Sequence, residues 1–128
     1  MIRVFIVDDH SIVREGAKRI IAGTSDMEAA GECSDGLEAL KQILENDYDV
    51  VLLDIALPGM NGLDVLRAVR AKKPNLPILI LSMYPEEQYA TRVLREGASG
   101  YITKESLPND LVNAVRKVAR GKRYISDF

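Results

Sequence analysis

Five polar side chains of this sequence stand at the ends of short apolar runs: Asp8, Asp9, Asp54, Ser82 and Lys104. A short apolar run is typical of a strand that is buried on both faces of a parallel sheet. The functional surface of such a sheet lies beyond the carboxyl ends of its strands. We therefore expect these five side chains to meet at one rim of the sheet.

Carboxylates gathered at one rim repel one another and favour binding of a cation. Two carboxylates about 4 Å apart repel by about 4 kcal/mol at an effective dielectric constant of about 20. Lys104 supplies one positive charge against three carboxylates. A divalent cation with oxygen ligands removes the excess, and Mg²⁺ commonly uses carboxylates, waters and a phosphate. Zinc is disfavoured because the sequence has no cluster of histidines and cysteines. The alternative is a solvated acidic rim with Lys104 as its counter-ion.

The same residues suit phosphoryl transfer to a carboxylate. This chemistry needs an in-line nucleophile, a metal ion and a second cation, and aspartate is an established phosphoryl acceptor. Asp54 is the predicted nucleophile because it stands alone at the end of the central strand. Asp9 is expected to be the more direct metal ligand and Asp8 to assist, through water. Lys104 is expected to pair with a phosphoryl oxygen as a point charge.

Strands and helices are predicted to alternate along the whole chain. The predicted strands are Ile2–Val7, Met27–Cys33, Val50–Leu53, Ile78–Leu81 and Gly100–Thr103. The second of these is the weakest and is expected near an edge. Five strand-helix alternations with short connections predict an α/β domain, a doubly wound parallel sheet covered by helices on both faces.

Capping residues and apolar stripes define the expected helices. Ser11 is expected to cap the first helix, which includes Ile12 among its apolar positions, and Gly23 to end it. Asp35 begins the second helix, whose apolar stripe includes Leu37 and Leu44. The third helix buries Val65, Leu66 and Val69, the fourth opens at Pro85 and buries Ala90 and Val93, and the last starts at Ser106 and Pro108.

Composition limits the class of protein. The 128 residues, 47% hydrophobic and 28% charged, fit one globular domain. The net charge of -2 argues against a nucleic-acid-binding module. No apolar run approaches the roughly 20 residues of a membrane span, and no signal peptide precedes the first strand. A single cysteine, Cys33, fits a reducing compartment, so we expect a cytoplasmic protein without membrane contact.

Several segments carry a resemblance to a known family: VDDH with Asp8 and Asp9, LLDIALPGMNG around Asp54, LILS with Ser82, and GYITK with Lys104. Together they resemble the receiver domain of two-component response regulators over essentially the whole chain. VDDHSIVREG, GASGYITKES and GKRYIS are most similar to the subfamily with a LuxR/NarL-type helix-turn-helix domain after the receiver. The resemblance implies a flavodoxin-like (βα)5 fold with five strands in the order 2-1-3-4-5.

The resemblance also implies the domain limits and the chemistry. Residues 1–121 would form the receiver, and residues 122–128 would begin a linker to an output domain outside this chain. A sensor histidine kinase would donate a phosphoryl group to Asp54, with Mg²⁺ (or Mn²⁺) held by Asp9, Asp54 and the backbone carbonyl of Ala56. His10 is then not the phosphodonor. The chain is not expected to be an enzyme, although it would phosphorylate itself from a phosphodonor and dephosphorylate slowly.

Ser82 and Tyr101 occupy the family's switch positions. The Ser82 hydroxyl is expected to bond the new phosphoryl group together with Lys104, which vacates space for the Tyr101 ring. Ala56 and Tyr84 occupy positions that influence dephosphorylation, and bulky Tyr84 is expected to shield the acyl phosphate. The surface that changes would comprise the fourth helix, the fifth strand and the fifth helix, an expected homodimer or output face. Transcription would be the output, with DNA bound only through the missing domain.

Other functions remain open at this point. Glu105 follows Lys104 where the family usually carries proline, which leaves the geometry of that peptide bond open. A dehalogenase-like phosphatase would need a second aspartate where Ala56 stands. An FMN carrier would need a hydroxyl-rich loop after the first strand, where Asp8 and Asp9 would repel the phosphate. A phosphorylation-independent interaction module of the same fold would leave the acidic cluster unexplained.

Overall fold

The structure is a computed structural model that describes residues 1–84 and 86–125. Strands and helices alternate as the sequence predicts. In chain order the elements are β1 (Ile2–Val7), α1 (Ser11–Ala22), β2 (Met27–Cys33), α2 (Gly36–Glu45), β3 (Val50–Asp54), α3 (Gly62–Lys72), β4 (Ile78–Ser82), α4 (Glu86–Arg95), β5 (Gly100–Thr103), α5 (Leu107–Ala119) and β6 (Tyr124–Ile125).

All strand pairs of the single sheet are parallel, in the order β2-β1-β3-β4-β5-β6. This order confirms the predicted 2-1-3-4-5 arrangement and places β2 at an edge. The sixth strand was not predicted. After a turn at Gly121, whose φ is 82°, the chain returns beside β5 and pairs Gly100 with Tyr124. Two residues are too few to give a periodic signal, so the sequence alone suggested a linker there.

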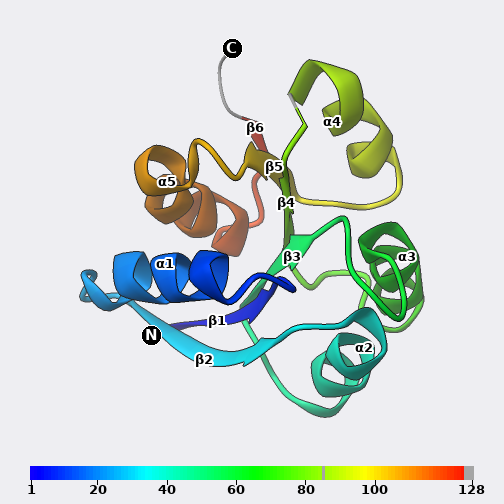
Figure 1. Ribbon diagram of the computed structural model, residues 1–128, viewed down its shortest axis with the longest axis horizontal. Helices are drawn as coiled ribbons and strands as arrows, with labels where there is room; N and C mark the ends of the chain where they lie inside the picture. Colours follow the sequence, from blue (N-terminus) through cyan, green and yellow to red (C-terminus); the bar gives the residue numbers. More distant parts are fainter. Residues whose placement is uncertain (85, 126–128) are drawn as a thin grey trace.

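Helices cover both faces of the sheet, and successive side chains of each strand point alternately into the two hydrophobic cores, one on each face. In β3, Val51 and Leu53 join the cluster under α2, α3 and α4, whereas Val50 and Leu52 join the cluster under α1 and α5. All four side chains are fully buried. Figure 1 shows α1 and α5 on one side of the sheet and the other three helices on the opposite side. A strand buried on both faces needs no polar alternation, which explains its continuous apolar run.

Two details of α1 differ from the prediction. The N-cap residue is His10, and Ser11 is the first helical residue, so the Ser11 side chain does not cap the helix. Ile12 is 82% exposed. The buried face of α1 is formed by Ala17 and Ile21, and Ile12, in the first turn of the helix, does not belong to it.

The start of α2 is confirmed, but its apolar stripe is narrower than predicted. The Asp35 carboxylate accepts a hydrogen bond from the Glu38 backbone N–H at 2.9 Å. Leu37 and Leu44 are exposed at 61% and 38%. Ala39 and Ile43 form the buried line instead, so these leucines stand on the outer side of the helix.

The remaining helices follow the prediction where they are described. Val65, Leu66 and Val69 of α3 are buried, as are Ala90 and Val93 of α4. Gly62 is the first residue of α3, and the Asn61 side chain caps this helix by accepting the Asp64 N–H at 3.0 Å. Pro85 lies outside the described residues.

The start of α5 agrees with the prediction. Ser106 is the N-cap of α5, with Pro108 in its first turn. No described peptide bond is cis, so the Lys104–Glu105 bond is trans. Among the described helices, none combines the length and the apolar character that a membrane crossing requires.

Candidate functional site

The predicted polar residues converge at the carboxyl edge of the sheet. Asp8 directly follows β1, Asp54 ends β3, Ser82 ends β4 and Lys104 directly follows β5. These strands are parallel neighbours, so their ends meet at one edge. A pocket of about 70 Å³ there is lined by His10, Asp54, Ile55, Ala56, Ser82, Met83, Tyr84 and Lys104. The predicted rim is therefore confirmed.

Lys104 bridges two buried carboxylates at the centre of this edge. Its Nζ lies 3.1 Å from Asp54 Oδ2 and 3.1 Å from Asp8 Oδ2. The side chains of Asp8 and Asp54 are 0% and 2% exposed. Asp8 Oδ2 accepts no hydrogen bond within the described part of the chain, and its contact with the ammonium is an ion pair. One ammonium group is thus shared by two buried carboxylates, and its single positive charge does not neutralise both.

Burial and charge shift the pKa values of this pair. Burial raises the pKa of Asp54, and repulsion by the Asp8 carboxylate raises it further. The Ala56 N–H and Lys104 favour the ionised form and so lower this pKa. The raising effects are larger, so the net pKa of Asp54 is raised. Burial lowers the pKa of Lys104, but the hydrogen bond to Asp54 and the attraction of the Asp54 and Asp8 carboxylates outweigh it, so its net pKa is raised. Lys104 therefore stays charged, while negative charge on Asp54 is only partly compensated.

Replacing Asp54 by asparagine should stabilise the cation-free protein at neutral pH. Because the folded-state pKa of Asp54 is raised, its contribution favours folding below its unfolded pKa, near 4, and is lost as the pH rises through the folded pKa. As the pH increases from 5 to 7.5, the free energy of unfolding of the parent should therefore fall relative to that of Asp54→Asn. Urea unfolding with EDTA at pH 5 and pH 7.5 measures the difference. Asp47→Asn, a change at an exposed carboxylate, is the control, and an equal gain there would contradict the argument.

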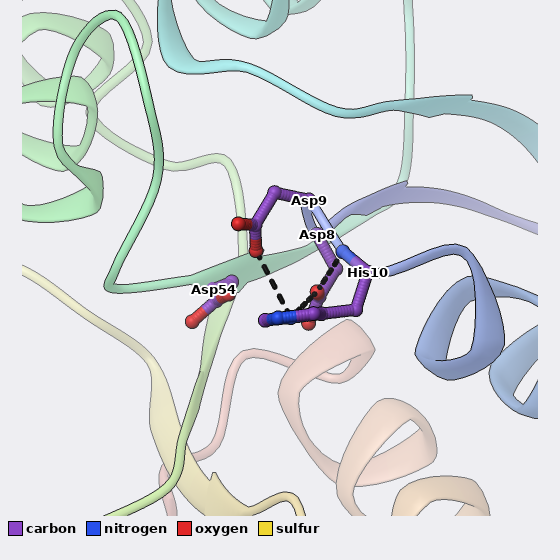
Figure 2. Close-up of side chains that lie close together, drawn as sticks. All are labelled: Asp8, Asp9, His10 and Asp54. Carbon is purple, nitrogen blue, oxygen red and sulfur yellow. Dashed lines mark hydrogen bonds and ion pairs between the residues drawn. The ribbon is translucent and has the colours of Figure 1, made fainter.

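Asp9 and His10 complete a cluster that can hold a metal ion. One ligand atom from each of Asp8, Asp9, His10 and Asp54 lies within 4.8 Å of the others. Figure 2 shows the His10 ring beside both aspartates of the β1–α1 turn, with Asp54 approaching from the end of β3. Carboxylate oxygens suit a hard divalent cation, and the unsatisfied, buried Asp8 Oδ2 fits a site with such an ion nearby. The residues present therefore fit a divalent cation.

The two predicted switch residues are both tied to the backbone of Tyr84. Ser82 Oγ accepts a hydrogen bond from the Tyr84 N–H at 3.0 Å, and the Tyr101 hydroxyl donates one to the Tyr84 carbonyl at 2.9 Å. Ser82 and Tyr101 are fully buried, while Tyr84 is 49% exposed. The Tyr101 ring thus already lies inside the protein, and its predicted rotation stays a prediction.

Sequence reasoning missed two contributions to the site. It did not place His10 among the candidate ligands, although its position directly after Asp9 could have suggested it. It also missed Arg14, one turn into α1, whose guanidinium donates a hydrogen bond to the Asp8 carbonyl at 2.7 Å. No local motif marks Arg14, because its role depends on how α1 lies against the end of β1.

The fold is an open, parallel α/β sheet covered by helices on both faces, and its carboxyl edge gathers three carboxylates and a lysine. Residues 4–116 match the response regulator receiver domain family. The chain belongs to this family.

Similar proteins indicate the subfamily of receiver domains to which the chain is most similar. Response regulator GacA of Pseudomonas viridiflava is 39% identical over 126 residues, which are 98% of this chain and 59% of GacA. The chain thus spans about three fifths of that relative. A LuxR-family two-component response regulator from Aurantimonas sp. SI85-9A1 superposes with a TM-score of 0.89 at 36% identity, covering 97% of this chain and 88% of that one. The receiver domain of the putative response regulator NarL from Mycobacterium tuberculosis gives 0.86 at 36% identity, covering 94% and 98%. These likenesses support the LuxR/NarL-type subfamily.

Proposed function

We propose that this domain accepts a phosphoryl group on Asp54 from a sensor histidine kinase and changes conformation in response. The observation that carries the proposal is the pairing of Asp54 with Lys104 at 3.1 Å inside a pocket that Ser82 also lines. A buried carboxylate with an ammonium at one oxygen and open space beside it is suited to become an acyl phosphate. The domain would label itself from a phosphodonor and lose the group slowly, without acting on other substrates.

The contacts of Asp54 assign a role to each neighbour. Oδ1 accepts the Ala56 N–H at 3.1 Å, which orients the carboxylate. A carboxylate oxygen attacks phosphorus, the phosphorus–nitrogen bond of the donor phosphohistidine breaks, and the imidazole keeps that electron pair and takes up a proton. Lys104 then pairs with a phosphoryl oxygen, and the Ser82 hydroxyl donates to another.

A divalent cation belongs to the proposal. Asp9, Asp54 and the Ala56 carbonyl would hold Mg²⁺, with Asp8 assisting through water, and Mn²⁺ could substitute. When bound, the cation neutralises negative charge on the phosphoryl oxygens. The proposal rests on the donor set and on the unsatisfied Asp8 Oδ2.

Phosphorylation would act as a population shift between two arrangements of the β4–α4 region. A full reversal from 1:99 needs about 5.5 kcal/mol of differential stabilisation. Hydrogen bonds to a charged group contribute about 1.5–3 kcal/mol each, so those from Ser82 and Lys104 reach this order. Because Ser82 and Tyr101 both bond the Tyr84 backbone, recruitment of Ser82 would disturb Tyr101 and the α4–β5–α5 surface. That surface would be the homodimer or output face.

The whole protein would be a longer regulator. Residues 1–121 would be the receiver, and residues 122–128 would lead to a C-terminal helix-turn-helix domain through which transcription is controlled and DNA is bound. The matched residues are only 59% of the GacA relative, so that protein has sequence beyond the part similar to this chain. With a sensor histidine kinase as its phosphodonor, the domain would act in the cytoplasm.

Asp54→Asn should abolish labelling by acetyl phosphate and Mg²⁺, because an amide is not a phosphoryl acceptor. Intact mass spectrometry should show one added phosphoryl group on the parent and none on the variant, with unchanged circular dichroism. Asp47→Asn, the matched control, should label as the parent does. Labelling of Asp54→Asn at an acid-stable site would refute the assignment.

Tyr84→Ala should shorten the lifetime of the acyl phosphate several-fold. Tyr84 lines the pocket beside Asp54, and its loss admits water to the phosphoryl group. The hydrogen bonds to Ser82 and Tyr101 use the Tyr84 backbone, so they survive the change. Decay of the labelled protein measures the rate, with Tyr84→Phe as the control that keeps the ring. A lifetime equal to the parent's would remove the shielding argument.

A further inference from the structure

We propose that a basic cavity at the amino edge of the sheet, the edge opposite Asp54, binds a small molecule that carries two or more phosphate groups. The cavity lies where β4 and β5 begin, since Pro77 and Ser99, the residues before these strands, both line it. Asp54 and Lys104 lie at the carboxyl ends of the same parallel sheet. This second site is therefore separate from the phosphoacceptor site and does not depend on it.

The described residues that line the cavity supply positive charge and hydrogen-bond donors but no carboxylate. The cavity has a volume of about 470 Å³ and lies between α3, the loops before β4 and β5, and the turn after α5. Its charged or polar side chains, among the described residues, are those of Arg70, Asn75, Ser99, Lys122 and Arg123. Three of these are cationic in a chain whose net charge is -2. The cavity therefore favours an anion.

Arg70 is the part of this site that the fold holds in place. Its Nε donates to the Gly97 carbonyl at 2.8 Å, and its Nη1 donates to the Lys73 carbonyl at 2.9 Å. Gly97 has a φ of 106°, and a Cβ there would lie 2.7 Å from Arg70 Cγ. The glycine thus lets the Arg70 side chain pass close to the backbone. These contacts orient the guanidinium beside the cavity before a ligand binds, which lowers the cost of binding.

An independent observation indicates that the Arg70 charge needs a counter-ion. The side chain is half-buried, and burial lowers the pKa of Arg70 without an opposing carboxylate among the described residues. Its Nη2 donates to no described residue, since Nε and Nη1 make the hydrogen bonds of this side chain. The carboxylate of Glu96, next to Gly97 in the chain, accepts hydrogen bonds from Arg67 at 2.8 and 2.9 Å instead. A partly buried cation that only carbonyl groups contact is stabilised by an anion.

Three further side chains can complete the set of donors. Ser99 Oγ accepts the Ile78 N–H at 3.2 Å, and its own hydrogen is donated to no described residue. The turn at Gly121, with a φ of 82°, brings Lys122 and Arg123 to the cavity. Both side chains are exposed, and neither forms an ion pair with a described residue. Long, exposed side chains of this kind can turn toward a bound anion, at some cost in rotamer freedom.

The size and charge of the cavity indicate the class of ligand. The pocket beside Asp54, where a single phosphoryl group would lie, is about 70 Å³, whereas this cavity is about 470 Å³. Arginine forms paired hydrogen bonds with phosphate oxygens, and lysine adds a point charge. Three cations match the several negative charges of a diphosphate or triphosphate group better than the single charge of a carboxylate. Pyrophosphate is the simplest probe with this chemistry.

Titration of the ¹⁵N-labelled protein with pyrophosphate, followed by NMR and calorimetry, tests the proposal. EDTA removes metal ions that could draw pyrophosphate to Asp54, and NaCl keeps the ionic strength constant. Amide signals of Gly97, Ser99 and residues 121–123 should shift, and the signal of Asp54 should not. The double variant Lys122→Gln with Arg123→Gln should weaken binding at least about tenfold, the scale of one lost charge-assisted hydrogen bond. Both residues are exposed, so the fold should be unchanged.

The matched control removes two exposed cations from other elements, Arg19→Gln on α1 with Lys41→Gln on α2. Its affinity should stay within about twofold of the parent's. Equal weakening by the two double variants would mean non-specific attraction and would overturn the site, as would shifts confined to the Asp54 edge or no binding at all.

Two other anions define the ligand class. Inorganic phosphate should bind at least about tenfold more weakly than pyrophosphate, because one phosphate group engages fewer of the cations. Equal affinity for the two would overturn the assignment to a polyphosphate. ATP should bind at least as tightly as pyrophosphate. Tighter binding of ATP would identify a nucleotide as the source of the polyphosphate group, equal binding would identify the polyphosphate group alone, and weaker binding would overturn the assignment, since the cavity would then exclude the larger molecule.

Discussion

Replacing Lys104 with methionine should destabilise the cation-free protein by about 3 kcal/mol at neutral pH, the usual scale for breaking a buried ion pair. The ammonium lies 3.1 Å from both Asp8 and Asp54, and its removal leaves two buried carboxylates without their shared counter-ion. Methionine keeps the length and apolar stem of the side chain, so the loss reports charge more than packing.

The sign of the pH dependence follows from Asp54. Lys104 now opposes the rise in the Asp54 pKa, so the variant should have a still higher Asp54 pKa. A group with a raised folded pKa loses its stabilising contribution as the pH increases through that pKa. The deficit of Lys104→Met should therefore be larger at pH 7.5 than at pH 5.

Urea unfolding of parent and variant in EDTA measures this deficit, and Mg²⁺ should reduce it by replacing the lost positive charge. The matched control is Lys41→Met on the exposed face of α2, which should change stability by less than about 0.5 kcal/mol. A Lys104→Met protein as stable as the parent at both pH values would show that the carboxylates need no counter-ion.

The convergence of the site could be predicted because few folds accommodate the strand pattern. Val50–Leu53 is apolar at every position, which requires cover on both faces and thus a parallel sheet with helical crossovers. Once the strands are parallel, residues at their carboxyl ends must share an edge. Asp8, Asp54 and Lys104 were therefore placed together without knowledge of any contact, and the structure confirms this placement.

Features that depend on neighbouring elements could not be predicted. A helical stripe fixes the inward direction only broadly, so Ile12 and Leu37 were counted among the apolar positions of their helices although both side chains are exposed. The partner of the Tyr101 hydroxyl is a loop carbonyl at Tyr84, and no side-chain pattern encodes a backbone acceptor. His10 joined the cluster through a turn closed by its own backbone N–H.

Gly62→Ala should destabilise the protein by about 3 kcal/mol or more, at the upper end of overpacking. Gly62 is buried at the start of α3, where its N–H donates to the Ile55 carbonyl at 2.9 Å. An added Cβ would collide with the Asp54 carbonyl oxygen and would lie 2.6 Å from the Ile55 Cα. Both obstacles are backbone at the end of β3, so no side-chain rotation relieves them, and the end of β3 itself must move.

Gly16→Ala is the matched control because the same change should act in the opposite direction. Gly16 lies within α1, and a Cβ there meets nothing within 4 Å. Alanine is favoured over glycine in a helix interior by about 0.5–1 kcal/mol, so this variant should be more stable than the parent. Urea unfolding of both variants gives the comparison, and acetyl phosphate labelling shows whether movement at Gly62 reaches Asp54. Equal stability of the two variants would mean that α3 can shift away from β3 freely, against the close backbone packing on which the position of Asp54 depends.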